Sequence, residues 1–234
     1  MATHLTRKEL KQDNIALKVE ETFGFLGAHR RQTVRIVIAT LVLVLIVAAI
    51  IFYRNSQREV RQQMLGEAIA AQNAPVGSAA PNGALSFPTE QAKRDAVRKA
   101  YERLLSEHSG SAEGYIAEYS LAGMDVESGK NDEARRRYQD VIDHANSSYA
   151  SLAKLSMAQI DFATNRSAEA QALLRDLMDH PTDLVSKAQA TIAYAKAIAP
   201  TRTDEARKLL SQVASQPGDT SSIAMTAINE LPQK

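Results

Sequence analysis

The sequence predicts an all-α protein in which a single N-terminal transmembrane helix precedes a solenoid of stacked helical hairpins. Three observations support this fold class. An uncharged stretch of 18 residues occupies Ile36–Tyr53. Beyond Thr89 the chain is rich in alanine and helical in pattern, and the whole sequence has no Trp and only 5% aromatic residues. Short motifs recur in that region at intervals of 36 residues, a period typical of two-helix repeats.

The stretch Ile36–Tyr53 contains no charged residue, Pro or Gly. As an α-helix it would cover about 27 Å, close to the hydrocarbon thickness of a bilayer. Lipid cannot satisfy backbone polar groups, so a helix is the expected form. A buried core helix is the alternative, but such helices are rarely apolar on every side over about five turns. The stretch is also longer than the apolar region of a signal peptide, so we expect a retained anchor that contacts membrane lipid.

The charges that flank the predicted anchor indicate its orientation. Within about twenty residues there are four Lys or Arg before it and three after it, which weakly favours a cytoplasmic N-terminus. The predicted cytoplasmic tail comprises residues 1–35. One helical face of this tail would carry Ile15, Val19, Phe23 and Leu26. Such an amphipathic helix lies on a membrane surface, docks a partner, or simply leads into the span.

The residues after the anchor differ in composition. Residues 54–72 have a polar helical pattern and are expected to continue the membrane helix outward as a juxtamembrane helix. Residues 73–88 contain three Pro, two Gly, two Ser and no charge, a composition typical of a flexible linker. We therefore expect the repeat domain to occupy residues 89–234.

Within the repeat domain, three Ala residues lie 36 positions apart, and each is followed four positions later by a large side chain. A small residue lets two helices approach closely, and the residue four positions on lies on the same face. The predicted packing residues are Ala134, Tyr138, Ala170, Leu174, Ala206 and Leu210. The pattern gives three full hairpins with one further helix on each side. These hairpins are Ser111–Ala145, Ser147–His180 and Thr182–Gln216.

The segment that runs from Gly129 through Ala134 and Tyr138 to Ile142 resembles the second half of a tetratricopeptide repeat. It departs from that family because no Trp starts a repeat and because Asp125 and Asp161 stand where the first helix usually has an aromatic residue. The resemblance implies that the inner helices line a groove that holds a peptide. An extended apolar segment or a partner helix would suit the groove, although several of its residues are alternatively core. The predicted groove residues are Tyr119, Leu155, Gln159, Phe162, Thr191 and Ala195.

The combination of one N-terminal anchor, a short basic tail and a divergent repeat domain resembles the YfgM-like ancillary subunits of the bacterial Sec translocon. This resemblance implies a bacterial inner-membrane protein with a periplasmic C-terminal domain. It further implies a role in protein export, with translocon subunits, a periplasmic chaperone or exported chains as partners. The alternative, from another functional class, is a structural scaffold of an envelope complex for cell division or outer-membrane assembly, without chaperone activity.

Composition argues against several other functions. The net charge is +1, without the strong basic excess of a nucleic-acid binder. The absence of Cys excludes disulfides, Cys-ligated zinc and thiol catalysis. Since the sequence has no phosphate-binding loop and no nucleophile elbow, we expect no enzyme activity, cofactor or small-molecule substrate.

Two further features are given structural interpretations. His108, His144 and His180 recur every 36 residues, but equivalent positions in stacked repeats lie on the order of 10–20 Å apart, too far to share a metal. The run Arg135–Arg137 is interpreted as a solvated face with i, i+4 ion pairs. A patch that binds lipid headgroups or an acidic partner is the alternative for this run.

Overall fold

The structure is a computed structural model and describes residues 30–77 and 85–231. The regular secondary structure of these residues is entirely α-helical, which confirms the all-α class. The chain divides into two compact units, residues 1–59 and residues 60–234. The amphipathic helix predicted within residues 1–35 falls largely outside the described residues.

Helix α2 (Arg30–Asn73) contains the predicted anchor and extends into the second unit. The described large apolar side chains between Val34 and Tyr53 are exposed by 47–77%. Among the described helices, α2 alone is long and apolar enough to cross a bilayer, judged by length and composition. Because its most apolar stretch is not buried, a core helix does not explain it. A helix of this kind near an N-terminus is a membrane span or a signal sequence.

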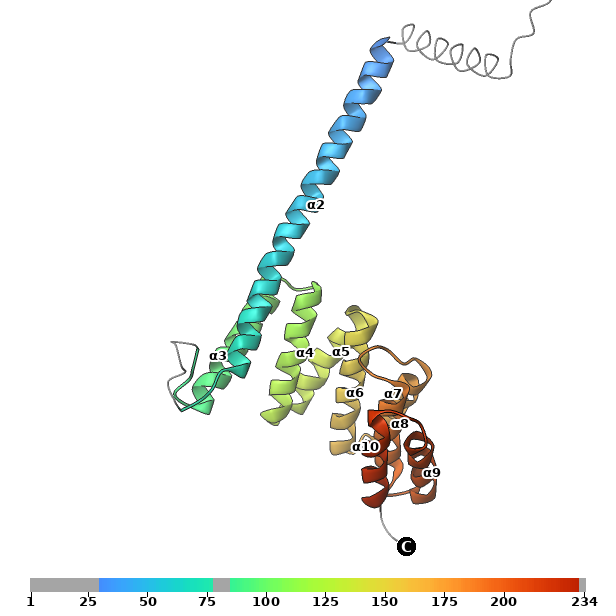
Figure 1. Cartoon of the computed structure of the whole chain (residues 1–234). Coiled ribbons are helices and arrows are strands. Elements are labelled where there is room, and N and C mark those ends of the chain that lie inside the picture. The colour runs from blue at the N-terminus through green and yellow to red at the C-terminus, as the bar shows by residue number, and fades with distance from the viewer. Residues whose placement is uncertain (1–29, 78–84, 232–234) are drawn as a thin grey trace, which may run out of the picture. The chain divides into compact units, whose positions relative to one another are not determined.

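The second unit continues as a row of helical hairpins (Figure 1). Each helix from α3 onward packs against the next one in the chain. The three predicted hairpins are α4–α5, α6–α7 and α8–α9, and α10 follows them. The helices after α2 are α3 (Glu90–Glu107), α4 (Ala112–Glu127), α5 (Asn131–His144), α6 (Ser147–Ala163), α7 (Ser167–Asp179), α8 (Lys187–Ile198), α9 (Thr203–Ala214) and α10 (Asp219–Asn229).

The repeat domain begins earlier than the sequence indicated. It was expected to start at residue 89, after a juxtamembrane helix (54–72), but the compact unit starts at Val60. Met64, Ala68 and Ala71 of α2 share a buried cluster with residues of α3 and α4. These three residues lie on one helical face, and two of them are alanines, which a search for large apolar residues overlooks. Helix α3, expected to stand alone, therefore pairs with the last turns of α2.

The segment 73–88, predicted as a flexible linker, connects the two helices of this first hairpin. The described ends of the segment are held together by backbone hydrogen bonds. Phe87 N donates to Pro75 O and Gly77 N donates to Phe87 O, each at 3.0 Å. This pairing forms an isolated parallel bridge between Val76 and Phe87. The described residues on either side, 74–77 and 85–88, thus belong to the repeat domain, and residues 78–84 lie outside the described part of the chain.

All six predicted packing residues are buried, with exposed fractions of 0–4%. They lie on α5, α7 and α9, the second helices of the three hairpins. The small Ala permits close approach, and the large residue one turn later fills the space between helices. The 36-residue spacing therefore corresponds to one hairpin of the stack.

The α4–α5 and α6–α7 hairpins each turn at a residue in a left-handed backbone conformation. Gly129 and Asn165 both have positive φ, at 74° and 61°, a conformation that Gly and Asn tolerate best. The next residue donates its backbone N–H to the carbonyl of Asp125 or Asp161, at 2.8 and 2.7 Å. This is the Schellman arrangement that ends a helix, and it fixes the backbone of both aspartates.

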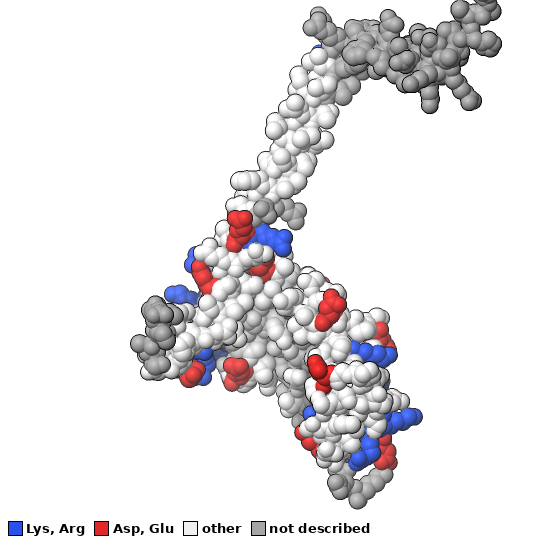
Figure 2. Space-filling view, viewed as in Figure 1, with Lys and Arg blue, Asp and Glu red and all other residues white. Residues whose placement is uncertain are grey.

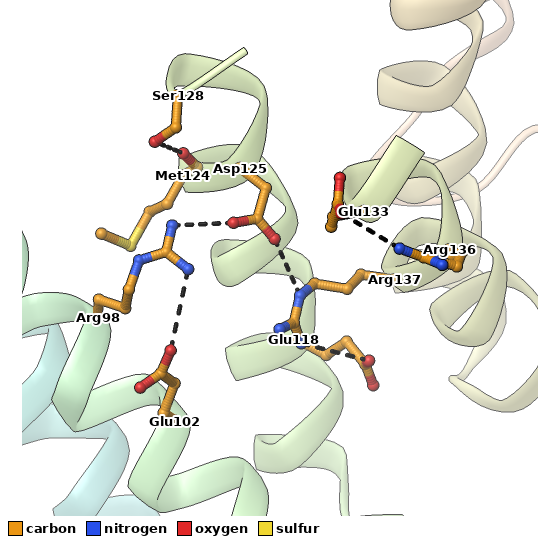
Figure 3. A network of polar contacts seen from close by, with 9 residues as sticks. All are labelled: Arg98, Glu102, Glu118, Met124, Asp125, Ser128, Glu133, Arg136 and Arg137. Carbon is orange, nitrogen blue, oxygen red and sulfur yellow. Dashed lines mark hydrogen bonds and ion pairs between the residues drawn. The ribbon is translucent and has the colours of Figure 1, made fainter. Parts of the chain in front are cut away.

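The side chains of the same two aspartates join neighbouring hairpins. Asp125, on α4, is 3% exposed, and its two carboxylate oxygens bind different arginines. Arg98 of α3 donates to Oδ1 at 2.9 Å and Arg137 of α5 donates to Oδ2 at 3.0 Å (Figure 3). One carboxylate therefore ties the first hairpin to both helices of the second.

Asp161, on α6, repeats this arrangement one hairpin further along and is fully buried. Arg135 Nε lies 2.7 Å from its Oδ1, and Arg166 Nε lies 3.3 Å from the same oxygen. At the next junction the equivalent position is Ala197. There Arg202, the equivalent of Arg166, donates directly to Gln171 Oε1 at 2.7 Å.

These contacts revise the interpretation of Arg135–Arg137. Arg136 alone behaves as a residue of a solvated face and pairs with Glu133 at 3.3 Å. Arg135 and Arg137 point to buried carboxylates on neighbouring helices instead. The run looks like a surface charge cluster in the sequence because its partners lie 26 and 12 residues away.

We predict that Asp161→Ala lowers the free energy of unfolding by about 3 kcal/mol, because it leaves Arg135 and Arg166 without their buried partner. Urea unfolding of the full chain in detergent, followed by circular dichroism, measures this loss. Asp132→Ala is the matched control, since Asp132 also contacts Arg166 but its side chain is 84% exposed. Its loss should stay below about 1 kcal/mol. Equal losses in the two variants would contradict the role of the buried carboxylate.

Candidate functional site

The described hairpins contain an apolar groove between α6 and α8, called here the α6–α8 groove. Its α6 wall consists of Leu155, Ala158, Gln159 and Phe162. These residues are spaced at i, i+3, i+4 and i+7 and therefore share one helical face. The α8 wall has the same kind of stripe, comprising Gln189, Ile192, Ala193, Lys196 and Ala197.

The floor and the end of the groove come from neighbouring helices. Leu174 of α7 lies beneath it, and Ile223 of α10 extends its lining. Leu174 is 1% exposed, whereas Ile223 is 51% exposed. The groove encloses about 470 Å3, within the range of ligand-sized clefts, so it could hold a few side chains of a bound segment.

Lys196 is the single charged residue in the lining of this groove. Its Nζ lies 3.2 Å from Glu230 Oε2, and the two side chains are 51% and 60% exposed. An ion pair this exposed contributes little stability and is readily exchanged for another partner. The groove therefore presents apolar surface with one available positive charge at its edge.

Three of the six predicted groove residues lie together in the α6–α8 groove. These are Leu155, Gln159 and Phe162, all on α6.

Tyr119 instead lines a smaller pocket of about 350 Å3 with residues of α3, α4 and α5. Its hydroxyl is 3.1 Å from Ser156 Oγ, and its ring centroid lies 5.4 Å from that of Tyr138. Burial raises the pKa of the Tyr138 phenol to about 12, so this hydroxyl stays protonated.

Thr191 and Ala195 do not line the groove, which corrects the sequence assignment on α8. Thr191 is 7% exposed and donates its hydroxyl to Lys187 O at 2.7 Å, and Ala195 is fully buried. Residues at equivalent repeat positions point in the same direction, so they cannot face one groove from opposite walls. The facing residues on α8 are one position further along, at Ile192 and Lys196.

The three repeated histidines occupy separate positions near helix ends. His144 Nδ1 lies 3.1 Å from Asp140 Oδ1, and His180 Nδ1 lies 3.0 Å from Asp176 Oδ1. Within residues 30–77 and 85–231, no group of three or more His, Asp or Glu side chains is arranged to hold a metal ion. Each exposed histidine thus pairs with an acidic residue one turn earlier on its own helix.

The charged residues of the second unit are mixed in sign. Figure 2 shows Lys and Arg interspersed with Asp and Glu on the visible face, without a continuous basic surface. Exposed ion pairs within single helices, such as Arg103 with Glu107, account for part of this mixture. A surface on which positive and negative side chains are mixed favours solubility and attracts a polyanion only weakly.

A stack of helical hairpins with an uncovered apolar groove defines a repeat protein of the class that binds other proteins. The chain belongs to the tetratricopeptide repeat-like domain family, whose pattern it matches over residues 30–214. Domains of this family are typically protein-interaction modules rather than enzymes. The matched region begins in α2 and ends with α9, so it includes the apolar helix and all the hairpins.

Comparison with curated proteins and comparison with solved structures each returned no match.

Proposed function

We propose that this protein is a membrane-anchored interaction module that binds an apolar segment of another protein in the α6–α8 groove. The observation that carries the proposal is the pair of facing stripes on α6 and α8, which no other described segment covers. Family membership supports protein binding in general. The α6–α8 groove is the surface at which we place the partner, because apolar clefts with a few polar groups are the usual sites of recognition.

The bound segment is short, mainly aliphatic and carries an acidic residue. The length follows from the groove volume of about 470 Å3, which accommodates only a few side chains. The acidic residue would replace Glu230 as the partner of Lys196. Gln159 is exposed at the groove and can hydrogen-bond an extended backbone, as in other modes of peptide recognition. The side-chain oxygen of Gln189 already accepts a hydrogen bond from Ser186 N in the cap of α8.

The location is part of the same proposal. The exposed apolar part of α2 anchors the chain in the bacterial inner membrane, with the N-terminus in the cytoplasm and the repeat domain in the periplasm. The flanking positive charges support this orientation. We place the protein beside the Sec translocon, where it assists export together with a periplasmic chaperone, because its architecture resembles ancillary subunits of that machinery. The alternative is that the protein is a scaffold of an envelope complex. The binding experiment below distinguishes this role from a role in export.

We predict that Ile223→Asp lowers partner recovery about tenfold, because it places a charge in an apolar contact. The measurement is quantitative affinity purification of the full chain from membranes in mild detergent, followed by mass spectrometry. Met225→Asp is the matched control, since Met225 lies on the same helix with 56% exposure and does not line the groove. Equal effects of the two substitutions would contradict binding in the groove.

The identity of the recovered proteins separates the two roles. Translocon subunits, a chaperone and exported chains are expected from a protein that assists export. Recovery of one stable folded envelope protein, with none of these, would contradict the export role and favour the scaffold.

We predict that a reporter enzyme that is active only outside the cytoplasm is active when fused after Lys234. The full-length chain should also remain in the membrane fraction after an alkaline wash, because one apolar helix of this length anchors stably. A reporter active only in the cytoplasm would reverse the orientation. Loss of the N-terminal helix from the mature chain would show that it is a signal sequence.

A further inference from the structure

Two arginines converge on one tyrosine at the junction between the α6–α7 and α8–α9 hairpins. Tyr194 of α8 is 4% exposed. Arg175 of α7 donates to its hydroxyl oxygen from Nη2 at 2.8 Å and from Nε at 3.2 Å. Arg202, which precedes α9, donates to the same oxygen from Nη2 at 3.4 Å. Two positively charged side chains therefore meet at an oxygen that carries no charge.

The two earlier junctions place a carboxylate where arginines converge, either that of Asp125 or that of Asp161. The equivalent position at this junction is Ala197. Arg202 finds a carboxylate elsewhere, since its Nη1 donates to Glu205 Oε2 at 3.1 Å. Arg175 makes its hydrogen bonds to the phenol instead. The junction thus holds two guanidinium groups, one bound to a carboxylate and the other to a neutral oxygen.

This arrangement is particular to the third junction. The residues 36 positions before Arg175 and Tyr194 are Gln139 and Ala158. Gln139 donates to Asp143 on its own helix at 2.8 Å, whereas Arg175 reaches across to α8. Because the hairpins pack one repeat earlier without an arginine or a tyrosine at these positions, the packing alone does not account for the pair.

The Arg175 guanidinium uses two donors on a single oxygen. The Nε–H and one Nη–H of an arginine point in parallel, and they match the two oxygens of a carboxylate. At Tyr194 both hydrogen bonds share the phenol oxygen. A carboxylate would give each donor its own acceptor and would add the Coulomb attraction that a phenol lacks.

The phenol can take part in binding an anion. A tyrosine hydroxyl is a donor as well as an acceptor, so Tyr194 can turn its O–H towards a carboxylate that receives the arginine donors. A hydrogen bond to a charged group is stronger beside a buried side chain than in water. Arg175 is exposed, and the Arg202 side chain is 38% exposed. A group from solvent therefore has access to both guanidinium groups.

We propose that Arg175, Arg202 and Tyr194 form a binding site for an acidic side chain of a partner protein. The carboxylate accepts the two parallel N–H groups of Arg175 and the O–H of Tyr194. Arg202 remains bound to Glu205 and contributes a second positive charge. None of the three residues of the site lines the α6–α8 groove, so this site can be tested independently of binding in that groove.

Nuclear magnetic resonance of the full chain in detergent micelles, with isotope-labelled arginine, tests the site. The probe is the blocked peptide acetyl-Ser-Glu-Ser-amide, and the control peptide has Gln in place of Glu. The Nε–Hε signals of Arg175 and Arg202 should shift and saturate together with the Glu peptide. The Gln peptide should bind about tenfold more weakly, because it lacks the charge. Arg136 is the internal reference, since its side chain is 75% exposed and pairs with Glu133 on its own helix.

Substitutions locate the binding. Arg175→Gln should weaken binding of the Glu peptide about tenfold, measured from the Arg202 signal, because the fork and its charge are lost. Arg175→Lys keeps the charge without the fork and should weaken binding about threefold. Arg136→Gln removes the same charge from α5 and should leave the titration unchanged.

Three results would overturn the proposal. The first is a Glu peptide that shifts Arg136 as much as Arg175, or that shifts neither Arg175 nor Arg202. The second is saturation that is unchanged in both Arg175→Gln and Arg175→Lys. The third is saturation by inorganic phosphate but not by the Glu peptide, because the site would then bind phosphate rather than an acidic side chain.

Discussion

The junctions between the first three hairpins depend on carboxylates that are buried between arginines from different helices. A buried charge is costly to desolvate, so its partners must stay in place, and only one register of the hairpins supplies them. Asp125 and Asp161 are also held through their backbone carbonyls by the turn that follows each helix. The same two residues therefore fix where each hairpin turns and how it packs on its neighbour. The positions of α4 and α6, and hence one wall of the groove, follow from these contacts.

Much of the fold was predictable because it depends on local pattern. The 36-residue spacing of Ala134, Ala170 and Ala206 identified three hairpins, and the structure has two helices within each of the predicted ranges. The start of the domain was not predictable in the same way. The face of α2 that packs on α3 is built partly from Ala68 and Ala71, and alanines do not stand out in an alanine-rich sequence.

The site was predicted only in part, for a geometric reason. Leu155, Gln159 and Phe162 could be found because they form a stripe on one helix. The residues predicted for the opposite wall, on α8, were wrong by one position. They were chosen as the repeat equivalents of the α6 residues, and equivalent residues point in the same direction. The residues of α8 that face α6 are Ile192 and Lys196. The ion pairs between different helices could not be predicted either. The neighbouring sequence does not distinguish Arg137, which binds a buried carboxylate, from Arg136, which faces solvent.

The proposed contact between the α6–α8 groove and a partner protein can be observed by site-specific photo-crosslinking in intact cells. The photoreactive residue is placed at Gln159, which is exposed in the groove. The control position is Arg136, whose side chain is 75% exposed and lies on α5 outside this groove. We expect discrete membrane-associated crosslinks from position 159 and none of the same products from position 136. Identical products from both positions, or no product from position 159, would show that the groove does not bind the partner.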